Sequence, residues 1–181
     1  HAGGAALSAQ PLSGTEGATF PFWRPDSQAI GFFADNKLKW IHAAGGPTTT
    51  LAPVDHAWGG SWNQNGDILF SPHLTKELWR VSSSSGSLPV QVTQLLPSSQ
   101  SGHVFPWFLP DGRHFLYWAT GNAEGRGVYI GTLDSPEGRR LVDDDTAAVY
   151  APPGFLLFAR QGRLLAQRFD LQTLALTGQT F

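Results

Sequence analysis

The feature that most constrains this chain is a hairpin pattern that occurs four times. Its clearest copy, residues 105–118, reads FPWFLPDGRHFLYW: an aromatic-rich strand, a Pro-Asp-Gly turn and a second strand. Asp-Gly between two apolar runs predicts a tight hairpin, because glycine adopts positive φ at no steric cost. Imperfect copies read FPFWRPDSQAIGFF, GGSWNQNGDILF and VYAPPGFLLF. The chain is therefore expected to consist of short antiparallel strands.

The hairpins recur with a regular period. One aromatic residue precedes each turn in the same register, and we call these four the turn aromatics: Trp23, Trp62, Phe108 and Tyr150. Their spacings are 39, 46 and 42 residues, and a period of about 40 to 45 with four short strands per unit is typical of β-propeller blades. Solenoid repeats of similar length are helical, and no long 3.6-residue pattern is present to support them.

The sequence thus predicts an all-β fold, a β-propeller segment of four four-stranded antiparallel blades in one structural domain. The expected blades span about residues 18–57, 58–102, 103–145 and 146–181. Asp35-Asn36 is expected to form a two-residue hairpin turn, and residues 119–127 an enlarged loop. The turn aromatics are expected to pack between adjacent blades, where a large ring buries well, with a ligand-stacking platform as the alternative.

Composition excludes several classes of function. The net charge is −2 and the Lys and Arg residues are scattered, so a nucleic-acid partner is not expected. Without cysteine, disulfides and thiolate metal sites are impossible. No apolar run approaches the roughly 18 to 20 residues of a membrane span, so no membrane contact is expected. The chain starts with His1 and contains no methionine, which suggests a piece of a longer reading frame or a processed product.

Three phrases carry a resemblance to a known family. PFWRPDSQAIGFFADNKLKWI, LPDGRHFLYW and AVYAPPGFLLFARQGRLLAQRFD resemble TolB-like (WD40-like) β-propellers, in particular those C-terminal to large bacterial serine/threonine protein kinases. The resemblance covers nearly the whole chain. It implies that residues 1–17, with a strand candidate at 9–12, are the outer strand remnant of a preceding blade. It also implies an extracytoplasmic location. The kinase signatures themselves, a glycine-rich nucleotide loop, HRD and DFG, are absent from this chain.

The candidate ligand site lies in the loops that lead into the innermost strands. Glu16, Asp55 and Asp143 each precede their own turn aromatic by seven residues, and equivalent propeller loops gather at one end of the central channel. The rim candidates are Glu16, Asp55, His56, His103, Asp143, Asp144 and Asp145. Such a rim suits a cation or a basic peptide. Solvated turns are the alternative, because no DxDxDG calcium loop is present.

Catalytic and cofactor motifs are not found. The six histidines lack zinc spacings such as HExxH, so no metal site and no cofactor is expected. Ser61 follows Gly59-Gly60 but Trp62 and Asn63 come next, so there is no GxSxG nucleophile elbow. The chain is therefore predicted not to be an enzyme.

The predicted function is a non-enzymatic sensor or protein-interaction module with a protein or peptide partner. The alternatives are an accessory propeller of a hydrolase or peptidase whose catalytic domain lies elsewhere, and a purely structural repeat. Four blades is the lower limit of the usual four to eight, and an open arc exposes a strand edge and apolar surface. A homodimer of arcs forming an eight-blade ring is therefore predicted, with a closed four-blade ring as the alternative.

Overall fold

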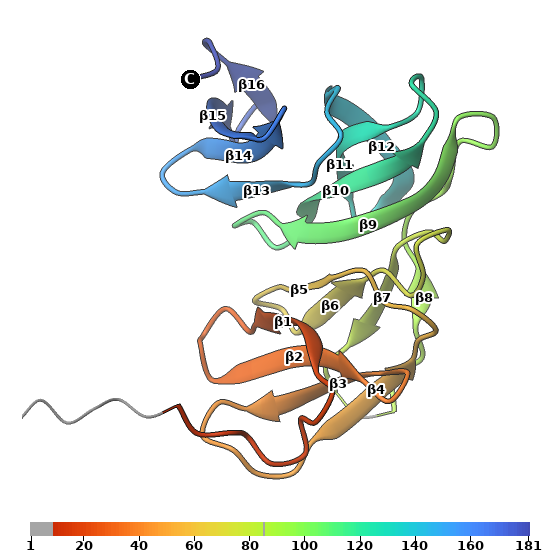
Figure 1. Ribbon diagram of the computed structural model, residues 1–181, viewed down its shortest axis with the longest axis vertical. Coiled ribbons are helices and arrows are strands. Elements are labelled where there is room, and N and C mark those ends of the chain that lie inside the picture. Colours follow the sequence, from red (N-terminus) through yellow and green to blue (C-terminus); the bar gives the residue numbers. More distant parts are fainter. Residues whose placement is uncertain (1–8, 85) are drawn as a thin grey trace, which may run out of the picture.

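The computed structural model describes residues 9–84 and 86–181. Within them the chain forms sixteen strands in four four-stranded antiparallel sheets, which confirms the predicted all-β class and the blade-like sheets. In each sheet the strands are hydrogen-bonded neighbours in chain order. The sheets stand around an arc that is open on one side, between the first and the fourth sheet (Figure 1). No helix in the described part is long and apolar enough to cross a membrane.

The strand boundaries follow the expected hairpins. The first sheet contains β1 (Thr19–Trp23), β2 (Ala29–Ala34), β3 (Lys37–His42) and β4 (Thr49–Pro53). The second contains β5 (Gly60–Trp62), β6 (Asp67–Phe70), β7 (Trp79–Ser82) and β8 (Val90–Gln91). The third contains β9 (Gln100–Phe108), β10 (His114–Gly121), β11 (Gly127–Thr132) and β12 (Ser135–Val142). The fourth contains β13 (Ala148–Ala151), β14 (Phe155–Arg160), β15 (Arg163–Asp170) and β16 (Ala175–Thr177).

Local turn chemistry explains the tightest connection. Asp35 and Asn36 both have positive φ, 52° and 55°, which is the geometry of the two-residue hairpin turn that the sequence predicts. The loop predicted at 119–127 is shorter than expected, because β10 and β11 extend into it. Its remaining turn is held by the Asn122 side chain, whose Oδ1 accepts hydrogen bonds from the backbone N–H groups of Glu124 and Gly125 at 3.0 and 3.2 Å.

The core lies between the sheets. Three clusters of buried side chains each join two consecutive sheets, and each contains one turn aromatic: Trp62, Phe108 and Tyr150. The expectation that these rings pack between blades is confirmed for those three. Trp23 differs, with 57% of its surface exposed, because its side of the first sheet faces the open end of the arc.

The N-terminal residues depart from the expected strand. Residues 9–12 lie outside every strand that the structure describes. Leu12 instead packs as a single apolar side chain against the cluster of Phe32, Ala34 and Ile41. The four strands of the first sheet all come from 19–53, so these residues cover a face of that sheet without joining its ladder. Residues 1–8, the rest of the predicted strand remnant, lie outside the described residues.

Candidate interaction surface

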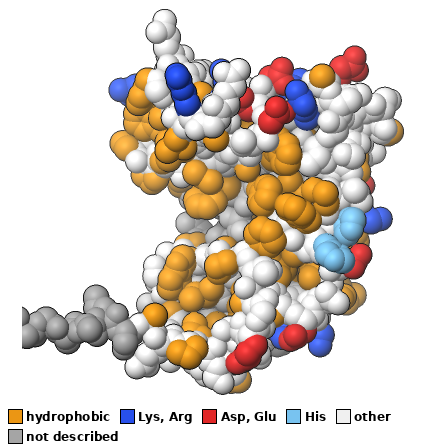
Figure 2. Space-filling model, in the orientation of Figure 1, with side chains coloured by type: hydrophobic (Ala, Val, Ile, Leu, Met, Phe, Trp, Pro, Cys, Tyr) orange, Lys and Arg blue, Asp and Glu red, His pale blue; other side chains and the backbone are white. Residues whose placement is uncertain are grey.

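The innermost strands β1, β5, β9 and β13 lie toward the middle of the arc (Figure 1), and residues of all four line a hollow there. At their turn ends this hollow has a volume of about 500 Å³ and is walled by all four sheets. Its walls include Phe22, Trp62, Trp107 and Tyr150, and none of the described Asp, Glu, Lys or Arg side chains lines it. Figure 2 shows hydrophobic side chains on both sides of the opening. We call this surface the channel surface.

Several large apolar side chains of the channel surface are open to solvent. Trp23 and Trp107 are 57% and 42% exposed, and Phe20, which lines the adjoining smaller hollow, is 39% exposed. Val149 on β13 lines a second hollow of about 220 Å³ together with Phe20 and Trp107. Clustered exposed aromatic residues on a monomer typically mark a site of interaction.

Two Phe-Pro bulges shape this surface. The register of β1 against β2 shifts between Thr19 and Phe22, and that of β9 against β10 shifts between Val104 and Trp107. The extra residues include Phe20 and Phe105, with φ of 47° and 52°. A bulge residue in this left-handed region is ordinarily glycine, so each phenylalanine is strained. Backbone strain of this kind concentrates at functional sites.

The bulged phenylalanines meet a third aromatic ring. Phe20, Trp58 and Phe105 form a cluster in which the ring centroids are 5.9 to 6.1 Å apart. The backbone N–H of Phe105 donates to the Trp58 carbonyl at 2.8 Å, which ties β9 to the loop before β5. Gly59 has φ of 94°, and a Cβ there would lie 3.2 Å from the Phe105 Cα. The close approach of the β9 backbone to the loop before β5 therefore requires glycine at position 59.

The structure brings two of the predicted rim residues together. The Oδ1 atom of Asp55 lies 3.2 Å from Nδ1 of His56, and both side chains are exposed. His73 lies beside them, with Nε2 at 4.0 Å from Asp55 Oδ2, and no spacing in the sequence indicated that it would. Glu16 is also exposed, and its Oε1 accepts a hydrogen bond from the Gly14 N–H at 3.3 Å.

His103 lies in the interior, with 0% of its surface exposed. Thr93 Oγ1 accepts a hydrogen bond from the Leu78 N–H at 2.9 Å, so its hydroxyl donates to Nδ1 of His103 at 2.8 Å. Nε2 of His103 then donates to Gln100 Oε1 at 3.0 Å. The imidazole is neutral and fully paired, and burial lowers its pKa to about 4. It is not accessible to a ligand at the rim.

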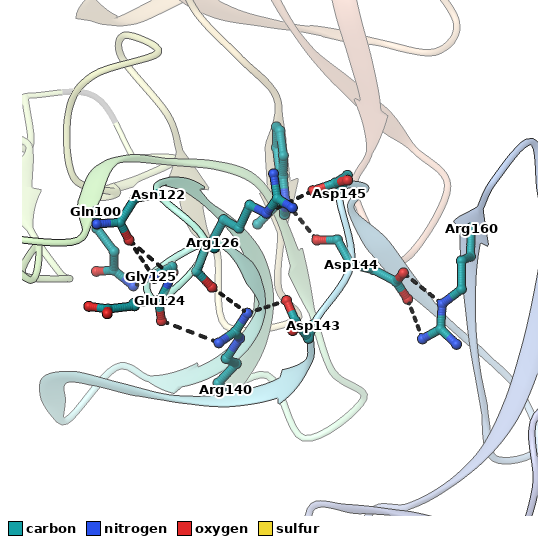
Figure 3. A network of polar contacts seen from close by, with 12 residues as sticks. Gln100, Asn122, Glu124, Gly125, Arg126, Arg140, Asp143, Asp144, Asp145 and Arg160 are labelled. Carbon is teal, nitrogen blue, oxygen red and sulfur yellow. Dashed lines mark hydrogen bonds and ion pairs between the residues drawn. The ribbon is translucent and has the colours of Figure 1, made fainter.

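The acidic run before β13 is neutralised within the chain (Figure 3). Asp144 is buried and accepts two hydrogen bonds from the Arg160 guanidinium at 2.8 and 2.9 Å, which raise the pKa of Arg160. Asp145 lies 3.1 Å from Arg126, and Asp143 pairs with Arg140. Arg140 also donates to the carbonyl of Glu124 at 3.2 Å. With three guanidinium groups beside three carboxylates, this segment holds no excess negative charge for a cation.

The turn aromatics Trp23, Trp62 and Tyr150, named above as the alternative ligand platform, line the channel surface. A second set of aromatic residues beside it was missed in the sequence, although a signal exists. An aromatic residue occurs three or four positions before each of the first three turn aromatics: Phe20, Trp58 and Phe105. The fourth repeat has Ala147 at the corresponding place. The pattern is visible only once the repeats are aligned.

Comparison with solved structures supports the propeller architecture. TolB from Acinetobacter baumannii superposes with a TM-score of 0.65 at 15% identity, over 88% of this chain and 42% of that one. Regucalcin, a calcium-binding protein from Agrobacterium tumefaciens, superposes with a TM-score of 0.64 at 16% identity, over 91% of this chain and 58% of that one. Puromycin hydrolase superposes with a TM-score of 0.66 at 16% identity, over 91% of this chain and 32% of that one. This chain therefore spans between about a third and three fifths of the lengths of these proteins.

At these identities the likeness concerns the fold alone. No protein-family description and no curated protein sequence matches the chain.

Proposed function

We propose that this chain is a non-enzymatic protein-interaction module, and that it binds an uncharged, apolar peptide segment on the channel surface. The observation that carries the proposal is the exposure of Trp23, Phe20 and Trp107 around a hollow walled by all four sheets. Exposed tryptophans in a concave apolar setting are the residues that most often dominate binding energy. A lining without charged side chains favours apolar over basic or acidic partners.

The channel surface replaces the acidic rim as the preferred binding place. Of the predicted rim residues, His103 is buried and Asp143 to Asp145 are paired with arginines. The strained bulges at Phe20 and Phe105 hold aromatic rings in fixed positions before any ligand arrives, and such preorganisation reduces the entropic cost of binding.

The experiment is a selection of displayed random peptides against the chain, followed by affinity measurement on single variants. We expect selected peptides to lose about 2 kcal/mol, roughly thirtyfold in Kd, on Trp107→Ala. Leu88→Ala is the matched control, because Leu88 is 84% exposed and lies outside the channel surface. Peptides whose affinity falls with Leu88→Ala but not with Trp107→Ala or Trp23→Ala would refute the assignment.

The wider setting of the module is part of the same proposal. The resemblance to kinase-linked TolB-like propellers favours an extracytoplasmic sensor segment of a larger bacterial protein. The accessory role beside a hydrolase domain is the second candidate, supported by the superposition on puromycin hydrolase. The flanking reading frame separates them: a kinase domain with one membrane span upstream supports the first, and a downstream GxSxG domain the second.

A further inference from the structure

We propose that Asp55, His56 and His73 form a binding site for a divalent cation of the zinc type. Their ligand atoms all lie within 4.8 Å of one another. Nδ1 of His56 is 3.2 Å from one carboxylate oxygen of Asp55, and Nε2 of His73 is 4.0 Å from the other. The two imidazole rings stand nearly perpendicular, at 88°, with centroids 6.0 Å apart. Three donors from two loops thus converge on one point.

The backbone holds these two loops together. The N–H groups of Asp55 and His56 both donate to the Pro72 carbonyl, at 3.3 and 3.2 Å, and the Trp58 N–H donates to the Ser71 carbonyl at 3.1 Å. The Ser71 hydroxyl donates to the His73 carbonyl at 3.2 Å. The loop before β5 and the loop after β6 therefore keep a fixed spacing, and a cation needs to move only side chains.

A neighbouring residue orients the ring of His73. Its Nδ1 lies 3.0 Å from Thr75 Oγ1 and accepts from the Thr75 N–H at 3.2 Å. This directs Nε2 toward Asp55. When a cation takes the Nε2 lone pair, the ring proton moves to Nδ1, which then donates to Thr75 Oγ1 and no longer accepts from the Thr75 N–H. Histidine ligands usually have such a partner on the second nitrogen, and it fixes both tautomer and orientation.

The donor set selects the ion. Two imidazoles and one carboxylate suit Zn²⁺, whereas Ca²⁺ prefers six to eight oxygen ligands. Bonds of about 2.0 Å in a tetrahedron place the ligand atoms about 3.3 Å apart. The 3.2 Å between Asp55 Oδ1 and His56 meets this requirement, and the 4.0 Å between Asp55 Oδ2 and the half-buried His73 closes with a rotation of the exposed Asp55 side chain.

Three protein ligands leave one tetrahedral position open. Asp55 and His73 lie at the edge of a hollow of about 930 Å³ between the first and second sheets, whose lining also contains Lys76, Glu77 and Trp79. The fourth position is therefore available to water or to a donor group of a bound molecule. This site is separate from the channel surface and does not depend on the function proposed above.

The test is titration of the whole chain with Co²⁺ and with Zn²⁺. His1 also offers an imidazole, so it is replaced by alanine in every variant. We expect one ion per chain, with the strong visible absorption of tetrahedral Co²⁺, which Zn²⁺ displaces. His73→Ala and His56→Ala should each weaken binding by more than roughly a hundredfold, and Thr75→Val by roughly tenfold.

Asp111 and His114 supply the matched control, because they form a second Asp–His pair for which the described residues provide no third donor. His114→Ala should leave the Kd for Co²⁺ unchanged. Circular dichroism of each variant separates loss of a ligand from loss of fold. The proposal is overturned if millimolar Co²⁺ gives no tetrahedral spectrum, or if folded His73→Ala binds as tightly as the parent. Either result would identify the cluster as simple Asp–His ion pairs.

Discussion

At the scale of single residues, His103 makes stability depend on pH. Its pKa falls from the ordinary 6.5 to about 4 because burial penalises the charged ring. The unfolded chain therefore binds a proton between about pH 4 and 6.5 that the folded chain does not, so stability rises with pH across this window and is complete above it. A shift of this size corresponds to about 3 kcal/mol.

Urea unfolding at pH 4.5 and pH 7 measures this effect. The unsubstituted protein should lose most of the roughly 3 kcal/mol at pH 4.5. The free energy of unfolding of His103→Gln, whose side chain cannot be protonated, should fall less between the two pH values. Equal losses in both proteins would assign the acid sensitivity to the carboxylates. Asp26 and Asp170 act mainly at still lower pH, because hydrogen bonds from Arg24 and from the Gln172 N–H respectively lower their pKa values below the ordinary 3.8.

Residues also show where sequence reasoning ends. The Asp35-Asn36 turn could be predicted because its cause is local: both residues tolerate positive φ. The burial of His103 could not, because Thr93, from the segment after β8, reaches it only through the packing of the second sheet on the third, whereas Gln100 lies on the same strand β9. The meeting of His73 with Asp55 likewise depends on two loops joined by tertiary hydrogen bonds. Spacing along the chain carries no trace of either contact.

At the scale of elements, the bulge in β9 should make a glycine substitution more stable than an alanine substitution, the reverse of the usual order in a strand. Glycine in a strand is normally less stable than alanine by about 0.5 to 1 kcal/mol. At Phe105 the left-handed φ of 52° penalises any Cβ, by about 1 to 2 kcal/mol. Phe105→Gly should therefore unfold at higher denaturant concentration than Phe105→Ala, although both lose the ring.

Val149 on β13 provides the comparison for this pair. It lies on another innermost strand, is 36% exposed and has no positive φ. Val149→Ala should be more stable than Val149→Gly, in the usual order. If alanine were better at both positions, the bulge would not be strained in solution.

At the scale of the whole molecule, the two ends of the arc present apolar faces. On the first sheet, the exposed Trp23 lies on the face that it shares with Ile30 and Ile41, and Leu12 already packs against the buried Ile41. On the fourth, Val149 pairs with Leu157, on the side opposite Tyr150 and the third sheet. Two copies joined end to end would cover both faces and close a symmetric ring, as the sequence analysis predicts.

Light scattering over a hundredfold dilution tests this assembly. We expect a dimer that dissociates in Leu164→Asp, because Leu164 is 73% exposed on β15 of the fourth sheet. Leu88→Asp, at a still more exposed site in the loop before β8, should leave the mass unchanged. A monomer at every concentration would contradict the dimer.

The uninterrupted order of strands within each sheet has a consequence for how such molecules change over time. Every described sheet consists of four strands that are consecutive in the sequence, so no sheet contains a strand from the stretch that forms its neighbour. The boundaries between sheets in the structure therefore coincide with boundaries between consecutive stretches of the coding sequence. Duplicating or deleting one such stretch adds or removes a complete building block and disturbs one interface at a time, as in other modular repeats. Duplication or deletion of a whole four-strand unit therefore leaves every remaining sheet complete. A deletion that begins or ends within a hairpin leaves incomplete sheets.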